Sequence, residues 1–149
     1  MAEDTAELEE LVRTVAAAAS AYIAGDMRRY VELIDHADDY TLMPPYGGDT
    51  WRGFDSSPEA LDATARLFHG GEARLQVDAT YASGDLAVLV AVERQHGEVG
   101  DLPDQDYSLR VTLVFRRRGP SWQLVHRHAD PLTRRISYDA LARLTRGEA

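Results

Sequence analysis

The sequence contains no cysteine, no lysine and no asparagine. Because there is no cysteine, the chain cannot form a disulfide, a thiolate metal site, an iron–sulfur cluster or a thiol nucleophile. Because there is no lysine, it cannot form a Schiff base with a carbonyl substrate or with pyridoxal phosphate. These absences exclude several kinds of covalent catalysis, and they leave histidine and the carboxylates as candidates for moving protons.

Positive charge and long hydrophobic runs are scarce as well. The 149 residues include 25 acidic and 16 basic side chains, which gives a net charge of -9. An acidic chain is repelled by nucleic acids and by anionic membranes, so we expect neither as a partner. No segment approaches the roughly 18 consecutive apolar residues of a transmembrane helix, and the first residues lack the pattern of a signal peptide. These observations predict a cytoplasmic protein.

The spacing of apolar residues predicts three helices in the first half of the chain. Residues 5–24 have the periodicity of an amphipathic helix, and a second helix follows Asp26. Ser57 and Pro58 are the residue types preferred at an N-cap and at the first helical position, and they predict a third helix that ends at Gly70. Helical structure therefore precedes most of the strands.

After the third helix the period changes from that of a helix to that of a strand. The alternation predicts strands over 73–82, 86–96, 107–118 and 121–129, and a shorter one over 40–43. Helices followed by antiparallel strands indicate an α+β fold, in which the helices pack on one face of a curved antiparallel sheet. We expect a single domain over 1–149, with 132–149 as a C-terminal extension that forms a short helix.

The last of these strands concentrates titratable side chains. Simple alternation places His126, His128 and Asp130 on the same face as Trp122. If this is the inner face, Glu93 on the strand 86–96 faces the two histidines. A histidine beside a carboxylate can transfer protons near neutral pH. We therefore predict His128 as a general acid or base, with His126, Glu93 and Asp130 as the other catalytic residues.

Two other interpretations of the histidines stay open. Both imidazoles could have a structural role, with hydrogen bonds to the backbone and to tyrosine hydroxyls. The spacing of His126 and His128 also suits a metal ion, with Asp130 or Glu93 completing the ligands. Because such a pair is common on strands, we predict neither a metal nor a cofactor.

Three segments of the chain resemble a known family. They are Tyr22–Asp26 at the first helix junction, Ala37–Tyr40 before the first strand, and Trp122–His128 in the last strand. With the order of elements over about residues 6–131, they resemble the NTF2-like superfamily, in particular its SnoaL-like and DUF4440-type domains. The resemblance implies an NTF2-like cone, with a pocket between the concave sheet face and the helices. It also implies cofactor-free isomerase, dehydratase or cyclase chemistry, or a non-catalytic module for ligand binding or assembly.

The same resemblance implies what lines the pocket and how the protein associates. The expected ligand is an apolar or aromatic small molecule. The expected ligand-binding residues are Tyr22, Tyr30, Met43, Tyr46, Trp51, Phe68, Tyr81, Val111 and Leu113. The loop that contains Tyr46, Trp51 and Phe54 either folds back over the core or lines the pocket opening. Because both faces of the strand 86–96 are apolar, we expect a homodimer through the outer face of the sheet.

Overall fold

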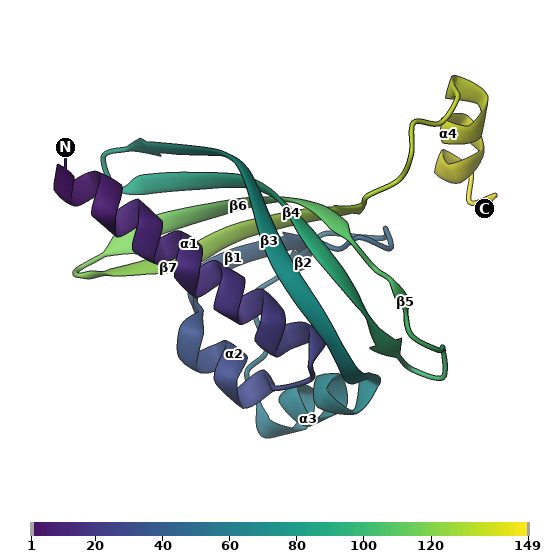
Figure 1. Cartoon of the computed structure of the whole chain (residues 1–149), viewed down its shortest axis with the longest axis horizontal. Helices are drawn as coiled ribbons and strands as arrows, with labels where there is room; N and C mark the ends of the chain where they lie inside the picture. The colour runs from purple at the N-terminus through teal and green to yellow at the C-terminus, as the bar shows by residue number, and fades with distance from the viewer. Residues whose placement is uncertain (1, 149) are drawn as a thin grey trace.

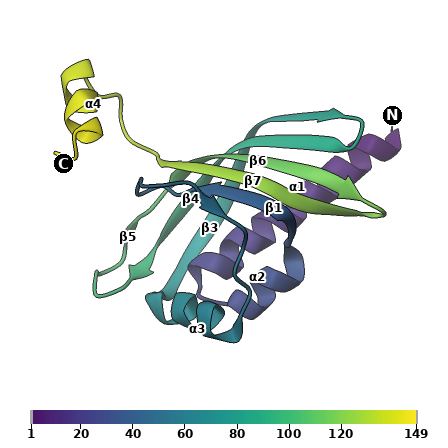
Figure 2. The same cartoon turned by 180° about the vertical axis from the view of Figure 1, so that it is seen from behind.

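The computed structural model describes residues 2–148, and it is an α+β fold with helices along one face of a sheet (Figures 1 and 2). The helices are α1 (Ala2–Ile23), α2 (Met27–Leu33), α3 (Pro58–Leu67) and α4 (Tyr138–Thr145). The strands are β1 (Asp35–Met43), β2 (Trp51–Arg52), β3 (Phe68–Ser83), β4 (Leu86–Val99), β5 (Gln105–Asp106), β6 (Leu109–Arg118) and β7 (Ser121–Pro131). The predicted fold class is confirmed.

The strands form one mixed sheet in the order β2-β1-β7-β6-β4-β3, and β5 extends it from β4. Strands β3, β4, β6 and β7 pair antiparallel, as the alternation predicts. The expectation of an antiparallel sheet throughout is wrong at β1, which lies parallel to β7. This pairing places β1, which follows α2 directly, next to β7, the last strand in the chain.

Three of the predicted helix ends are confirmed: α1 ends before Gly25, α2 begins after Asp26, and α3 begins after Ser57. The predicted end of the third helix at Gly70 is wrong, because α3 ends at Leu67 and Gly70 lies in β3. Gly25 follows α1 with φ of 78°, and a Cβ there would lie 2.3 Å from the backbone oxygen of Phe68, so the turn requires glycine. Asp26 then caps α2 by accepting from the backbone N–H of Arg29. Ser57 caps α3 in the same way. The close turn at Gly25 holds α1 and α2 across the sheet.

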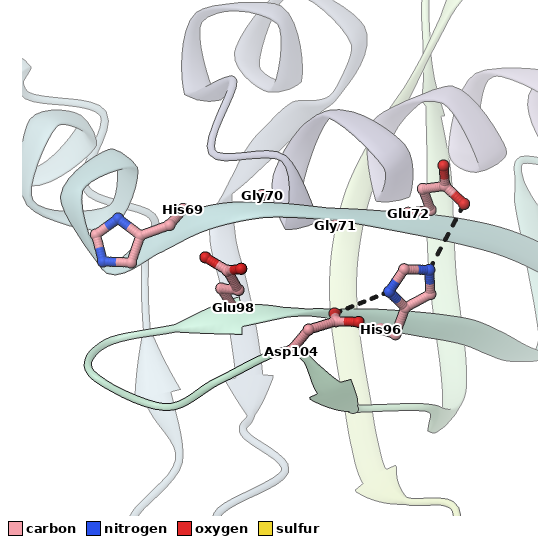
Figure 3. A pocket seen from close by; sticks show the side chains of 7 residues that line it. All are labelled: His69, Gly70, Gly71, Glu72, His96, Glu98 and Asp104. Carbon is pink, nitrogen blue, oxygen red and sulfur yellow. Dashed lines mark hydrogen bonds and ion pairs between the residues drawn. The ribbon is translucent and has the colours of Figure 1, made fainter.

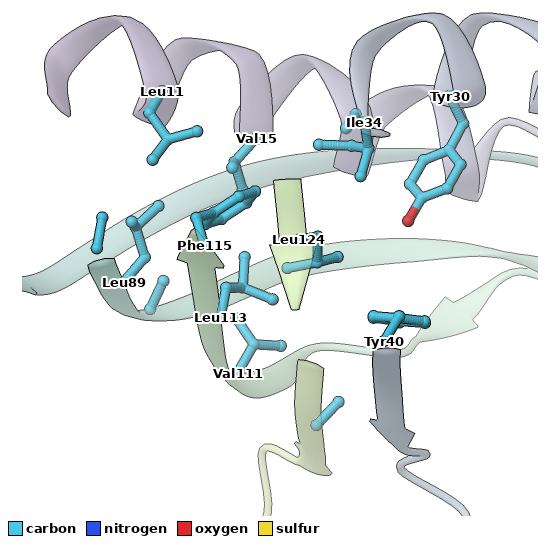
Figure 4. Close-up of a cluster of buried hydrophobic side chains, with 14 of the residues drawn as sticks. Leu11, Val15, Tyr30, Ile34, Tyr40, Leu89, Val111, Leu113, Phe115 and Leu124 are labelled. Atoms are coloured by element: carbon cyan, nitrogen blue, oxygen red, sulfur yellow. The ribbon is translucent and has the colours of Figure 1, made fainter. Parts of the chain in front are cut away.

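The hydrophobic core lies between α1, α2 and one face of the sheet, which we call the inner face (Figure 4). Leu11 and Val15 of α1 pack over Leu89 and Phe115, which β4 and β6 contribute. Burial of such side chains stabilises the fold by roughly 1.5–3 kcal/mol for each of them. The opposite surface of the sheet, the outer face, is not covered by any described helix.

An irregularity in β7 decides which of its side chains reach the core. Phe115 pairs with Leu124, but Val114 pairs with His126, so β7 contains one extra residue at Val125. Such a bulge reverses the alternation beyond it. As a result Leu124 lies on the inner face before the bulge, and Arg127 lies on the inner face after it.

The C-terminal helix α4 stands apart from the sheet at the end of an extended segment, as both views show (Figures 1 and 2). Ser137 caps this helix through its side chain. Among the described residues, no helix has the length and the hydropathy needed to cross a bilayer.

Candidate functional site

A buried ion pair occupies the inner face of the sheet. Arg127 donates from both terminal nitrogens to the Glu93 carboxylate, at 2.8 Å and 2.6 Å. The Glu93 side chain is 5% exposed and that of Arg127 is 22% exposed. Burial by itself lowers the pKa of Arg127, but the adjacent Glu93 carboxylate raises it, and the net direction is upward. The site therefore holds a guanidinium that stays charged, on a side chain that is partly accessible.

Three tyrosines surround this ion pair. Tyr22 and Tyr30 come from α1 and α2 and pack edge to face, with ring centroids 5.1 Å apart. Tyr40 comes from β1 and is buried. Burial raises the pKa of Tyr22 and of Tyr30, and it raises the pKa of Tyr40 to about 12. All three phenols therefore keep their protons near neutral pH, and they can donate to an oxygen atom.

A neutral histidine completes the group. His36 of β1 lies within hydrogen-bond distance of the Tyr30 hydroxyl, at 3.1 Å from its Nε2. Its ring stacks on Phe54 with centroids 3.7 Å apart and an angle of 6° between the planes. Burial lowers the pKa of His36 to about 4, so the imidazole is uncharged at neutral pH. We call Tyr22, Tyr30, His36, Tyr40, Glu93 and Arg127 the interior cluster.

One buried polar side-chain atom, the hydroxyl of Tyr107, has no partner among the described residues. Tyr107 lies beside Gln95, and it precedes Leu109, which pairs with Glu93. Its hydroxyl is buried and has no hydrogen-bond partner among the described residues. An unsatisfied buried hydroxyl is costly, and a bound molecule with a polar atom would remove this cost.

The prediction that His126, His128 and Asp130 share a face with Trp122 and look toward Glu93 is wrong. After the bulge they pair with Val114, Thr112 and Arg110, whose side chains lie on the outer face. His126 bonds there to the Thr41 hydroxyl at 2.7 Å, and His128 lies 3.4 Å from Asp130. Of the four predicted catalytic residues, only Glu93 belongs to the interior cluster. A catalytic role for the other three stays a prediction, and it would require a site on the outer face.

The predicted ligand-binding residues divide into three groups. Tyr22, Tyr30 and Phe68 lie together beside the interior cluster, with Val111 and Leu113 in the core next to them. Met43, Tyr46 and Trp51 are exposed beyond the core, and Phe54 is the one aromatic side chain of that loop that packs on it. The inner-face prediction fails for Tyr81, which pairs with the outer-face Val88 and is 61% exposed.

Sequence reasoning missed His36, Tyr40 and Arg127. One signal for Arg127 was available, because Glu93 alternates with the apolar Ala91 and Leu89 and a buried carboxylate needs a cationic partner. No pattern marks the bulge at Val125, so strict alternation assigns Arg127 to the wrong face.

The residues that the structure describes do not bring a set of metal ligands together. Glu93 and the His126–His128 pair lie on opposite faces of the sheet, so the ligand set considered from the sequence is not assembled. Among the described residues, no three histidine or carboxylate side chains come together in a way that could hold a metal ion.

Helices that close over the concave face of a strongly curved sheet, with a polar cluster between them, define an NTF2-like fold. The chain belongs to the family of SnoaL-like domains, whose family model matches residues 12–132. Comparison with curated proteins gave no match.

Solved structures agree with this assignment. A candidate scytalone dehydratase from Novosphingobium aromaticivorans has a TM-score of 0.71 and 12% identity, over 91% of this chain and 100% of its own. A candidate dehydratase of the NTF2-like family from Streptomyces avermitilis has a TM-score of 0.67 and 22% identity, over 88% and 99%. An NTF2-like superfamily protein from Salmonella enterica serovar Typhimurium has a TM-score of 0.67 and 16% identity, over 89% and 94%. These likenesses concern the fold.

Proposed function

We propose that the protein binds an apolar or aromatic small molecule that carries a carbonyl oxygen, and that it transfers a proton on this molecule without a cofactor. The observation that carries the proposal is the Glu93–Arg127 ion pair, which lies buried beneath three protonated tyrosines. Hydrogen-bond donors fixed in a low-dielectric site stabilise negative charge on an oxygen better than water does.

The proton transfer is assigned to the Tyr30–His36 pair. A C–H bond beside the carbonyl breaks, and the proton passes to the neutral His36 imidazole, directly or through the Tyr30 hydroxyl. The electron pair moves to the carbonyl oxygen, which Arg127 and the hydroxyls of Tyr22 and Tyr40 stabilise. Return of the proton to another carbon gives an isomerase reaction, and its delivery to a departing hydroxyl gives a dehydratase reaction. The candidate dehydratases of the same fold support this class of reaction.

Exchange of hydrogen for deuterium tests the proposal without knowledge of the natural substrate. Cyclic and aromatic ketones that stabilise the protein thermally are incubated with it in D₂O, and the deuterium beside the carbonyl is measured by mass spectrometry. We expect His36→Gln to abolish exchange while ligand binding persists. His128→Gln on the outer face is the matched control and should exchange at the wild-type rate. Binding without any exchange would instead favour a non-catalytic ligand-binding module.

We also propose a homodimer through the outer face. Val88, Val90 and Val114 lie there on adjacent strands, and no described helix covers them. A contiguous apolar patch of this kind is typical of a subunit interface. Val90→Asp should convert a dimer to a monomer in analytical ultracentrifugation. A wild-type monomer at micromolar concentration would contradict the proposal.

A further inference from the structure

The C-terminal arm, residues 132–148, has an apolar stripe without a partner surface in the described part of the chain. Ile136, Leu141 and Leu144 are each at least 43% exposed, and Tyr138 is more exposed still. In the described structure, the hydrogen bonds and ion pairs of α4 are formed within the arm itself. Because a helix of eight residues is marginal in water, another surface must stabilise it.

The arm also differs from the rest of the chain in charge. Residues 132–149 contain four arginines and two carboxylates, so their net charge is +2. Because the whole chain has a net charge of -9, the other 131 residues have a net charge of -11. An anionic membrane would attract the arm but repel the much larger body. An acidic protein surface with exposed apolar side chains fits the arm better.

Such a surface exists where β3, β4 and β5 meet, and we call it the acidic corner. Residues 98–106 contain four carboxylates and no arginine. The exposed side chains of Leu67 and Leu102 lie among them, and the N–H of Gly100 donates to the carbonyl of Leu67. A hollow of about 340 Å³ opens beside the corner, lined by His69, Gly70, Gly71, Glu72, His96, Glu98 and Asp104 (Figure 3).

Contacts within the hollow hold the corner in place. His96 bridges Asp104 at 2.9 Å and Glu72 at 3.5 Å, as the dashed lines in Figure 3 show. These contacts tie the segment before β5 to β3. The acidic corner is therefore an ordered surface, and Glu98 projects beside the bridge without taking part in it.

We infer that the arm of one molecule docks on the acidic corner of a second copy of this chain. Leu141 and Leu144 pack against Leu102 of the partner, and Arg143 and Arg146 approach its carboxylates. The base of the arm adjoins its own corner, because the N–H of Leu132 donates to the carbonyl of Ser108 at 2.9 Å. The arm nevertheless projects away from the body in both views (Figures 1 and 2). Within the homodimer proposed above, on which this inference rests, each arm reaches the acidic corner of the partner, so two equal contacts form together.

Because the chain contains no cysteine, every disulfide in a crosslinking experiment must involve the introduced cysteines. Leu144→Cys is mixed with a mass-tagged Leu102→Cys chain under mild oxidation, and the mixed disulfide is quantified by mass spectrometry. Leu86→Cys is the matched control, because Leu86 is 47% exposed against 54% for Leu102 and lies at the other end of β4. We expect at least tenfold more mixed disulfide with Leu102→Cys than with Leu86→Cys. Equal yields would overturn the inference.

Dilution distinguishes docking of the arm on a second molecule from docking on its own molecule. In the double variant Leu102→Cys/Leu144→Cys, docking on a second copy predicts disulfides between chains, with a yield that falls on dilution. A disulfide within one chain, formed at a rate independent of concentration, would overturn the inference.

Charge reversal tests the ionic part of the contact. Arg143→Glu/Arg146→Glu in the Leu144→Cys chain should lower the mixed yield at least tenfold. Glu98→Arg/Asp101→Arg in the tagged Leu102→Cys partner should restore it. Because salt screens such charges, the pair of Leu144→Cys and Leu102→Cys chains without charge reversal should also crosslink less at 0.5 M than at 0.05 M NaCl. A loss that the reversed partner does not restore would overturn the charge pairing.

Discussion

The inner and outer faces of the sheet carry similar titratable groups in different surroundings. On the inner face Glu93 and Arg127 form a bidentate pair that is largely withdrawn from water. On the outer face His128 and Asp130 are each about half exposed, and their separation is 3.4 Å. A charge in a low-dielectric interior must be paired, whereas an exposed charge is already stabilised by water. Removal of one partner should therefore cost much more stability on the inner face than on the outer face.

The largest effect is expected from Arg127→Ala. This substitution leaves the Glu93 carboxylate buried without its partner, and we expect a loss of roughly 3–5 kcal/mol in the free energy of unfolding. Urea denaturation followed by circular dichroism measures it. Arg116→Ala, which breaks the exposed pair with Asp39 on the outer face, is the control and should change little. Equal losses for the two variants would remove the distinction between the faces.

A smaller effect is expected from neighbouring positions of β7. Leu124→Ala should cost about 2–4 kcal/mol, because it leaves a cavity in the core. His128→Ala should cost less than about 0.5 kcal/mol, because the side chain is exposed on the outer face. The same denaturation measurement applies to both. A strongly destabilised His128→Ala protein would show that this strand faces the other way.

The dependence of stability on pH should identify His36. The pKa of His36 is about 4 in the folded protein, against 6.5 for a histidine in an unstructured peptide, so only the unfolded state binds a proton between these values. The free energy of unfolding therefore falls as the pH is lowered from 6.5 to 4, by up to about 1.4 kcal/mol per pH unit from this group. Above and below that window the contribution of His36 is constant.

His36→Gln removes the titrating group and should flatten this part of the curve relative to the wild-type protein. His128→Gln should leave the fall in stability between pH 6.5 and pH 4 as it is in the wild-type protein. The measurement is a series of urea titrations at half-unit pH intervals. Identical curves for wild type and His36→Gln would contradict the assignment of His36 as a buried neutral imidazole.

The smallest effect concerns a single outer-face hydrogen bond. Thr41→Val removes the hydroxyl that meets Nδ1 of His126 at 2.7 Å, and a loss of about 1 kcal/mol is expected. Thr112→Val on the same face is a suitable comparison. Thr112 lies opposite His128 in the pairing of β6 with β7, and this backbone pairing is the relation on which the comparison depends. If both variants unfold alike, the contact between β1 and β7 at this point does not contribute to stability.

Much of the fold could be predicted because its signals are local. Ser57 and Pro58 specify the start of α3, and Gly25 ends α1 at a turn that no other residue fits. The alternation of β4 correctly placed Glu93 with Ala91 on one face. The candidate site was harder to predict because His36 and Tyr40 join Arg127 only through the parallel pairing of β1 with β7, and the two strands are far apart in the chain.

The sequence by itself determined the end of α1 at Gly25, the starts of α2 and α3, the run of strands and the need for a partner for a carboxylate among apolar neighbours. These features depend on residues close together in the chain. Only the tertiary structure decided which face of β7 reaches the interior. The bulge at Val125 places one more residue in β7 than in the paired part of β6, and it reverses the alternation that follows. Bulges arise from the fit between two paired strands, and neither strand specifies that fit alone. For this reason Arg127 lies in the interior cluster, and the two histidines lie on the opposite surface.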